Sequence, residues 1–147
     1  MSNKQEIEWT LEDNTDEVLT ELEKRMPEAL FGVGNELYKS IYNFMTDDKI
    51  VDTGRLRGSI SFSTPYQNYK NPTPNNKEND FIENANFKNT VVYGSNVEYA
   101  SFVNSGTSKQ RARKFLENGT ARAIPNIKAV VEKVLKGGKE WQLKITT

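Results

Sequence analysis

Two residue types, cysteine and histidine, are absent from this sequence of 147 residues. Without cysteine, disulfide bridges, thiol nucleophiles and thiolate metal sites are excluded. Without histidine, the commonest general base and metal ligand are missing, and with them the usual serine and cysteine triads and zinc hydrolase sites. Any catalysis would have to use carboxylates, lysine or tyrosine. The sequence therefore predicts a protein that is not an enzyme and that needs no cofactor.

Long apolar runs are also absent. No stretch approaches the roughly 20 apolar residues that span a bilayer, and the polar, acidic start is unlike a signal peptide. We therefore expect a soluble chain that is intracellular when made and has no membrane partner. Its length fits a single domain over residues 1–147, large enough to bury about two-thirds of its unfolded surface.

Charge is balanced over the whole chain, with 20 acidic and 20 basic side chains, but it is unevenly distributed. Residues 1–50 hold 12 acidic and 5 basic side chains, a net charge of −7, whereas residues 51–147 hold 8 and 15, a net charge of +7. This asymmetry is suited to head-to-tail stacking of like subunits. The alternative, that the charges merely solvate separate faces, fits the composition equally well.

A long first helix is expected near the N-terminus. Asn14, with Glu17 three positions later, resembles a capping box, and apolar residues then recur at three- and four-residue steps to about residue 46. Pro27 removes a backbone donor and clashes with the preceding turn, so we expect a kink or a break into two helices there. Gly32 and Gly34 weaken the next turn, either through loose packing or to permit close approach of another chain.

Alternating polar and apolar residues predict short strands. Residues 6–11 and 141–145 alternate near the two ends of the chain and are expected to pair with each other. Further strands are expected over residues 59–63, with Ile60 pointing inward, and over residues 87–93. Strands of this length and pattern are typical of a small antiparallel sheet.

Helical periodicity returns in the second half of the chain. A short helix or turn is expected over residues 96–104, and a longer helix over residues 117–136. The buried side of the longer helix is predicted to comprise Ala121, Ile124, Ile127, Val130, Val131, Val134 and Leu135. Together the elements describe an α+β domain in which a long N-terminal helix and a C-terminal helix pack on a small antiparallel sheet.

Two loops interrupt this pattern. Residues 64–86 are rich in proline, asparagine, lysine and tyrosine and are expected to form a long mobile hairpin loop; connections of that length are usually functional or disordered. Residues 105–113 are expected to form a flexible basic loop.

Residues 51–60, Val-Asp-Thr-Gly-Arg-Leu-Arg-Gly-Ser-Ile, support two interpretations. Asp-Thr-Gly after an apolar pair is typical of aspartic proteases, in which two aspartates share a proton. The chain has no second such triplet, and Arg55 and Arg57 beside Asp52 would favour ionised carboxylates. A dimeric aspartic protease using Asp52 is therefore a remote hypothesis. A structural joint is favoured, in which Asp52 or Thr53 caps a turn that the glycine permits.

Other charged side chains offer weaker candidates. A loop with several cations attracts phosphate, and the cations here are Lys109, Arg111, Arg113, Lys114 and Arg122. No helix-turn-helix, zinc or RNA-recognition signature accompanies them, so a solvated basic loop is favoured and contact with DNA is the alternative. Glu98 and Glu117 have no spacing that makes them an acid and base pair; Glu98 is expected to satisfy backbone donors or an arginine.

Three separated segments resemble one protein family. They are residues 51–60, residues 92–107 (Val-Tyr-Gly-Ser-Asn-Val-Glu-Tyr-Ala-Ser-Phe-Val-Asn-Ser-Gly-Thr), and Lys-Phe-Leu at 114–116 running into Ala121. Their order and spacing are similar to those of the tail-component or head-tail joining proteins (neck and tail-completion proteins) of long-tailed phages. The chain departs from the family where Asn104 and Ser105 replace a glutamate and a small or aromatic residue before Gly-Thr, and where Lys114 replaces a frequent proline.

The resemblance implies a structural virion protein of the neck or tail, present in the host cytoplasm during assembly. It implies a homo-oligomeric ring, six-fold or a multiple of six, that joins the DNA-filled head to the tail. The expected partners are head-completion or connector proteins and tail-tube or tail-terminator proteins, with genomic DNA close by. The candidate subunit-interface residues are Arg55, Arg57, Tyr66, Tyr69, Tyr99, Phe102, Arg111 and Arg113. Salt bridges, core packing and disorder are the alternative roles of these residues and of the 64–86 loop.

Overall fold

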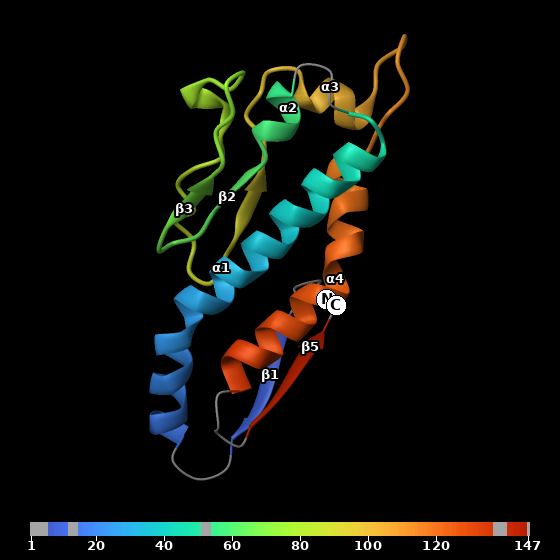
Figure 1. Cartoon of the computed structure of the whole chain (residues 1–147). Coiled ribbons are helices and arrows are strands. Elements are labelled where there is room, and N and C mark those ends of the chain that lie inside the picture. The colour runs from blue at the N-terminus through green and yellow to red at the C-terminus, as the bar shows by residue number, and fades with distance from the viewer. Residues whose placement is uncertain (1–5, 12–14, 51–53, 137–140, 147) are drawn as a thin grey trace.

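A computed structural model describes residues 6–11, 15–50, 54–136 and 141–146. The elements in chain order are β1 (Glu6–Leu11), α1 (Thr15–Asp47), α2 (Arg55–Gly58), β2 (Ser61–Ser63), β3 (Asn68–Lys70), η1 (Glu78–Asp80), β4 (Val92–Gly94), α3 (Ala100–Ser105), α4 (Phe115–Lys136) and β5 (Trp141–Thr146). The long helices α1 and α4 cross, and a small antiparallel sheet lies against α1 (Figure 1). This is the α+β architecture that the sequence predicts.

The helix α1 continues through Pro27 without a break. Its axis bends in its first half, drawn in blue, so the proline is accommodated by curvature (Figure 1). The predicted capping residue Asn14 lies outside the described residues. Buried side chains recur along the helix at the predicted steps, and they include Leu22, Leu30, Leu37, Ile41 and Met45. No helix in the described part of the chain is long and apolar enough to cross a membrane.

The glycines of α1 mark close contacts within the chain. Gly34 faces Phe62 of β2 so closely that a Cβ atom would overlap the ring. Gly32 faces Val130 of α4 in the same way. Neither predicted role is observed as stated: the two glycines permit close approach, but of other segments of the same chain rather than of another chain.

The small sheet has the strand order β3-β2-β4, with both neighbours antiparallel to β2. The predicted strand over residues 59–63 is shorter, because α2 and its C-terminal turn extend to Ser59. Ile60 is buried as predicted. The predicted strand over residues 87–93 was wrong at its start, because pairing begins only at Val92 and Phe87 is 72% exposed.

The segment 64–86 carries more structure than a mobile loop. It contains β3 and η1, and it buries Asp80, Phe81 and Ala85. The backbone amides of Ile82 and Ala85 donate to the hydroxyls of Ser61 and Ser63, on the face of β2 opposite Phe62. The segment is therefore part of the folded body.

The helix α4 keeps the predicted buried face in its second half, where Ile127, Val130, Val131 and Val134 are partly buried, and departs from it in its first half. Ala123 is fully buried, whereas Ile124 is 47% exposed and Ala121 is also exposed. The cause is close contact with α1: a Cβ at Gly119 would collide with Ile41, so the helix approaches α1 along the small residues at 119 and 123. The neighbouring position 124 then points away from α1. Leu135 is buried as predicted.

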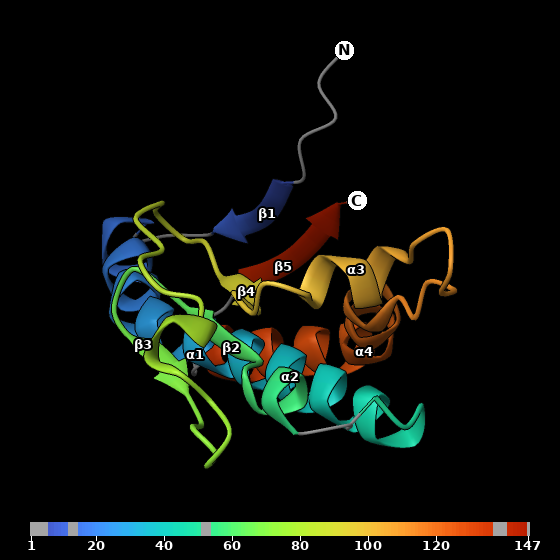
Figure 2. The same cartoon turned by 90° about the horizontal axis from the view of Figure 1, so that it is seen from above.

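The strands β1 and β5 form a separate antiparallel ribbon, which confirms the predicted pairing of the two terminal strands. The register pairs Ile7 with Ile145, Trp9 with Leu143 and Leu11 with Trp141 at the Cα level. The ribbon lies toward the end of the molecule where α1 begins and α4 ends, away from α2 and α3 (Figure 1). Seen from above, the ribbon lies to one side of α1 and α4 (Figure 2).

Candidate interaction site

The first part of the candidate site is an ion cluster around Arg55, which follows the left-handed turn at Gly54 (φ 77°). Its Nε and Nη2 donate to Asp80 at 3.0 and 2.8 Å, and its Nη1 and Nη2 donate to Glu98 at 2.9 Å each. The Asp80 side chain is 3% exposed, that of Arg55 14% and that of Glu98 70%. This arginine node, Arg55 with Asp80 and Glu98, joins α2, η1 and the segment before α3.

The hydrogen bonds of the arginine node fix its charges. Those donated by Arg55 hold the pKa of Asp80 well below its usual range and also lower the pKa of Glu98. The Lys77 amide and the Asn76 side chain donate to Asp80 as well, at 2.9 and 3.3 Å. The two carboxylates in turn raise the pKa of Arg55. All three groups are ionised at neutral pH, so the node is suited to holding segments together rather than to transferring protons.

The second part is a polar junction at Asn104, which is buried at the end of α3. Its Oδ1 accepts the backbone N–H of Leu116 at 3.0 Å, and its Nδ2 donates to Glu117 Oε1 at 3.0 Å. Its backbone carbonyl accepts the N–H of Lys114 at 3.0 Å. Amides in the first turn of a helix lack partners within the helix, so Asn104 caps α4 from a different helix.

Between these two helices, residues 106–113 project from the body of the molecule, as the orange segment in Figure 1 shows. The segment turns back on itself through a hydrogen bond of 2.8 Å from the Thr107 N–H to the Gln110 carbonyl. Arg111 is exposed on it. Phe102, on the α3 helix that leads into the segment, is 57% exposed. We call Phe102 together with residues 106–113 the projecting patch.

Two of the cations expected in the basic loop are held by the end of α1. Arg113 donates through Nε to Asp48 at 3.0 Å and also binds the Asp48 carbonyl, and Arg122 donates to Asp47 at 2.9 Å. Arg111 faces solvent instead. The structure therefore divides the predicted basic set into side chains that anchor the fold and side chains that are exposed.

The remaining candidate interface residues lie in several places. Arg57 donates to Thr46 at 2.9 Å, Tyr69 stacks on the buried ring of Phe62, and Tyr99 is half-buried against the core. Tyr66 is 53% exposed, but it lies in the turn between β2 and β3, at the end of the sheet far from α2.

Arg55, a candidate interface residue, is the centre of an ion cluster, which is the salt-bridge alternative given for it. The expected arginine partner of Glu98 is this residue, so that prediction is confirmed. Among the eight candidates, Phe102, Arg111 and Arg113 come together at the projecting patch, and Arg113 is tied to α1.

Asp52 and Thr53, on which the protease hypothesis and the predicted cap rest, lie outside the described residues. The described neighbour Gly54 occupies the N-cap position of α2 with a left-handed backbone, as the structural-joint interpretation expects of the glycine. In the described ranges, no group of three or more Asp, Glu, His or Cys side chains is placed to hold a metal ion.

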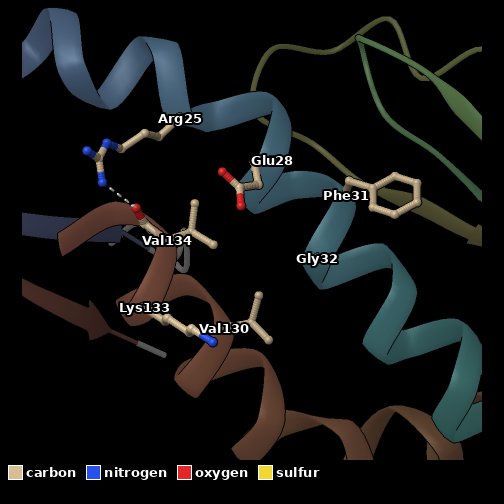
Figure 3. A pocket seen from close by; sticks show the side chains of 7 residues that line it. All are labelled: Arg25, Glu28, Phe31, Gly32, Val130, Lys133 and Val134. Carbon is tan, nitrogen blue, oxygen red and sulfur yellow. Dashed lines mark hydrogen bonds between the residues drawn. The ribbon is translucent and has the colours of Figure 1, made fainter. Parts of the chain in front are cut away.

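A hollow of about 430 Å³ lies between α1 and α4 (Figure 3). Phe31, Val130 and Val134 line it, and charged side chains from both helices surround it. One of these, Arg25, donates to the Val134 carbonyl at 3.1 Å. The hollow thus combines apolar walls with a charged rim, which suits an apolar group more than an ion.

Comparison of the chain with protein-family models, with curated proteins and with solved structures gives no match. The resemblance to the phage family therefore stays a prediction that rests on the residues themselves. What the geometry adds is the spatial relationship of the three segments that carry it.

Sequence reasoning missed the serines of β2. Ser61 Oγ accepts the Ile82 N–H at 2.8 Å, and Ser63 Oγ accepts the Ala85 N–H at 2.9 Å. The signal was present, because serine alternates with apolar residues from 59 to 63. A solvent-facing strand surface favours longer polar side chains, whereas short hydroxyls suit a face that is covered by another backbone. Asn104 was noticed as a departure from the family pattern, but its capping role was not predicted.

Proposed function

We propose that the chain is a structural virion protein of a long-tailed phage. It assembles as a ring at the neck or tail top and joins the DNA-filled head to the tail. The observation that carries the proposal is that residues from the three resembling segments meet in the fold: Leu56, Ala100 and Phe115, one from each segment, share one buried cluster. Arg55 of the first segment also binds Glu98 of the second. The three segments are far apart in the sequence but form one structural unit. This is expected if the shared pattern preserves the fold of a structural family.

The projecting patch is the surface through which this unit contacts its neighbours. Phe102 is 57% exposed on the helix that leads into a segment projecting from the body, and that segment carries the exposed Arg111 (Figure 1). Aromatic and arginine side chains are enriched at protein interfaces and supply many of their anchors. The arginine node and Asn104 hold the base of the patch in place. Docking therefore costs little conformational entropy there. The partners are further copies in the ring and the adjacent head-completion or tail-terminator proteins.

Gene deletion with complementation tests this function. A phage that lacks the gene is expected to make filled heads and separate tails that fail to join, as counted by electron microscopy. Wild-type protein restores joined particles, and Phe102→Asp does not. Phe87→Asp, at a position 72% exposed and outside the patch, is the matched control and restores them. Normal yields of joined particles after deletion would contradict the proposal.

Contact with DNA is the second candidate, because Lys109, Arg111 and Lys114 are exposed. Binding through such cations releases counterions and weakens steeply with salt. The test is to titrate purified protein with duplex DNA at salt concentrations from about 50 to about 200 mM, the range over which such binding loses most of its affinity. Absence of binding at the lowest salt removes this candidate and leaves the joining function in place.

A further inference from the structure

We propose that strand β1 of one copy of this chain pairs with strand β5 of the next copy, so that the terminal ribbon is the joint between successive subunits. This inference deepens the proposed function and rests on it for the ring in which the joint operates. The projecting patch lies toward the opposite end of the molecule from the ribbon, so the two surfaces are distinct (Figure 1).

The first observation is the incompleteness of the ribbon. Its strands have six residues each, against three in each strand of β3-β2-β4, yet it contains two strands only. An isolated two-stranded ribbon is marginally stable in water, and three or more strands are normally needed. In the described residues, the outer edges of β1 and β5 pair with no other strand. An unpaired edge of this length is a template for adding a strand.

The charges of the two strands select the partner. β1 carries Glu6 and Glu8, and β5 carries Lys144. Pairing β1 with β1, or β5 with β5, sets like charges near one another, which is destabilising. Pairing β1 with β5 gives register positions of opposite charge, as the Cα register pairs position 8, a glutamate, with position 144, a lysine, within one chain. A second copy of this chain therefore offers each edge the complementary strand.

The pattern of the ribbon is also continuous in such a sheet. The register places positions 6, 8 and 10 opposite 146, 144 and 142, and these share one face because side chains alternate along a strand. The apolar positions 7, 9, 11, 141, 143 and 145 share the other face. If an added strand keeps this register, or shifts by an even number of residues, its polar positions extend the polar face and its apolar positions extend the apolar face. Because β1 meets β5 rather than itself, the contact is head-to-tail, which is the type of contact that forms a ring when the rotation between successive copies closes.

Charge reversal tests the pairing. Glu8→Lys and Lys144→Glu, each alone, are expected to weaken self-association of the full chain by about tenfold at low salt, measured by sedimentation velocity. An equal mixture of the two variants is expected to regain wild-type association, since each copy then meets opposite charge on its neighbour. Within each variant chain, the paired register positions 8 and 144 still carry like charges, so a merely internal role gives no rescue in the mixture. Absence of rescue, or of wild-type self-association, overturns the proposal.

The absence of cysteine allows a second test that identifies the strands. One tagged chain carries Thr10→Cys and an untagged chain carries Gln142→Cys. Mild oxidation of the mixture is expected to give mainly the mixed disulfide dimer, read by mass. Equal or greater linking of Thr10→Cys chains to one another would show β1 against β1 and overturn the proposal.

Different experimental results contradict the ribbon joint and the proposed joining function. Virions that contain the chain, and that assemble normally with Glu8→Lys, contradict the ribbon joint and leave the joining function intact. Charge-dependent association of a chain that is missing from virions contradicts the joining function and leaves the ribbon joint intact.

Discussion

Arg55 and Asp80 form a two-point ion pair, with Nε 3.0 Å from Oδ2 and Nη2 2.8 Å from Oδ1. The two residues lie 25 positions apart, in α2 and η1. Paired N–H donors on a planar guanidinium match the two carboxylate oxygens, which gives such a pair both energy and direction. This pair holds segment 64–86 against the unit that carries the projecting patch.

Substitution of Asp80→Asn is expected to lower the free energy of unfolding by about 1–3 kcal/mol, because it leaves a largely buried guanidinium with a weaker partner. Urea unfolding at pH 7 measures the change. Glu98→Gln is the matched control and is expected to have a much smaller effect, since the Glu98 side chain is 70% exposed and its pair is screened by solvent. Equal losses for the two variants would contradict the importance given to Asp80.

The pH dependence of stability follows from the direction of the shift. The pKa of Asp80 in the folded protein is held below its unfolded value, mainly by hydrogen bonds from Arg55. The stability that Asp80 contributes is therefore present above its unfolded pKa of about 3.9 and is lost as pH falls below it. Unfolding free energies at a series of pH values down to about 2 are expected to fall less steeply for Asp80→Asn than for wild type. Parallel curves for the two proteins would refute the assignment.

Asn104→Ala is expected to cost about 1 kcal/mol of stability, since the Leu116 amide loses its cap. Hydrogen exchange should show faster exchange at the start of α4, while the middle of the helix keeps its relative protection. Asn118→Ala, at an exposed position two residues after Leu116, serves as the control and should leave the Leu116 amide unchanged. Unchanged exchange at Leu116 in Asn104→Ala would rule out the capping role.

Gly34→Ala is expected to destabilise the protein by about 1–3 kcal/mol, because the new methyl group overlaps the buried ring of Phe62. Alanine has a higher helix propensity than glycine, which favours the variant, but this contribution is smaller, at about 1 kcal/mol. Combining Gly34→Ala with Phe62→Leu makes room for the methyl group, so the double variant should lose less stability than the sum of the single variants. Strict additivity would show that the two residues do not conflict.

Local patterns in the sequence predicted what depends on periodicity. The apolar steps of α1, the end of α4 at Lys136 and the pairing of the two terminal strands are all readable from nearby residues. The partner of Arg55 could not be predicted in this way. Asp80 lies in a segment with few apolar residues, and the burial of Asp80 follows from tertiary contacts alone. The first half of the buried face of α4 was mispredicted for a related reason: hydrophobicity pointed to Ile124, but close packing selected Gly119.

The central claim is that this chain forms part of the joint between head and tail. A cryo-electron microscopy map of intact particles tests it most directly, with the structure of α1, α4 and the three-stranded sheet as the search shape. The account predicts density for this fold in a ring at the neck or tail top, with Phe102 in contact with a neighbouring chain. Particles whose neck and tail density is fully accounted for by other chains would contradict it.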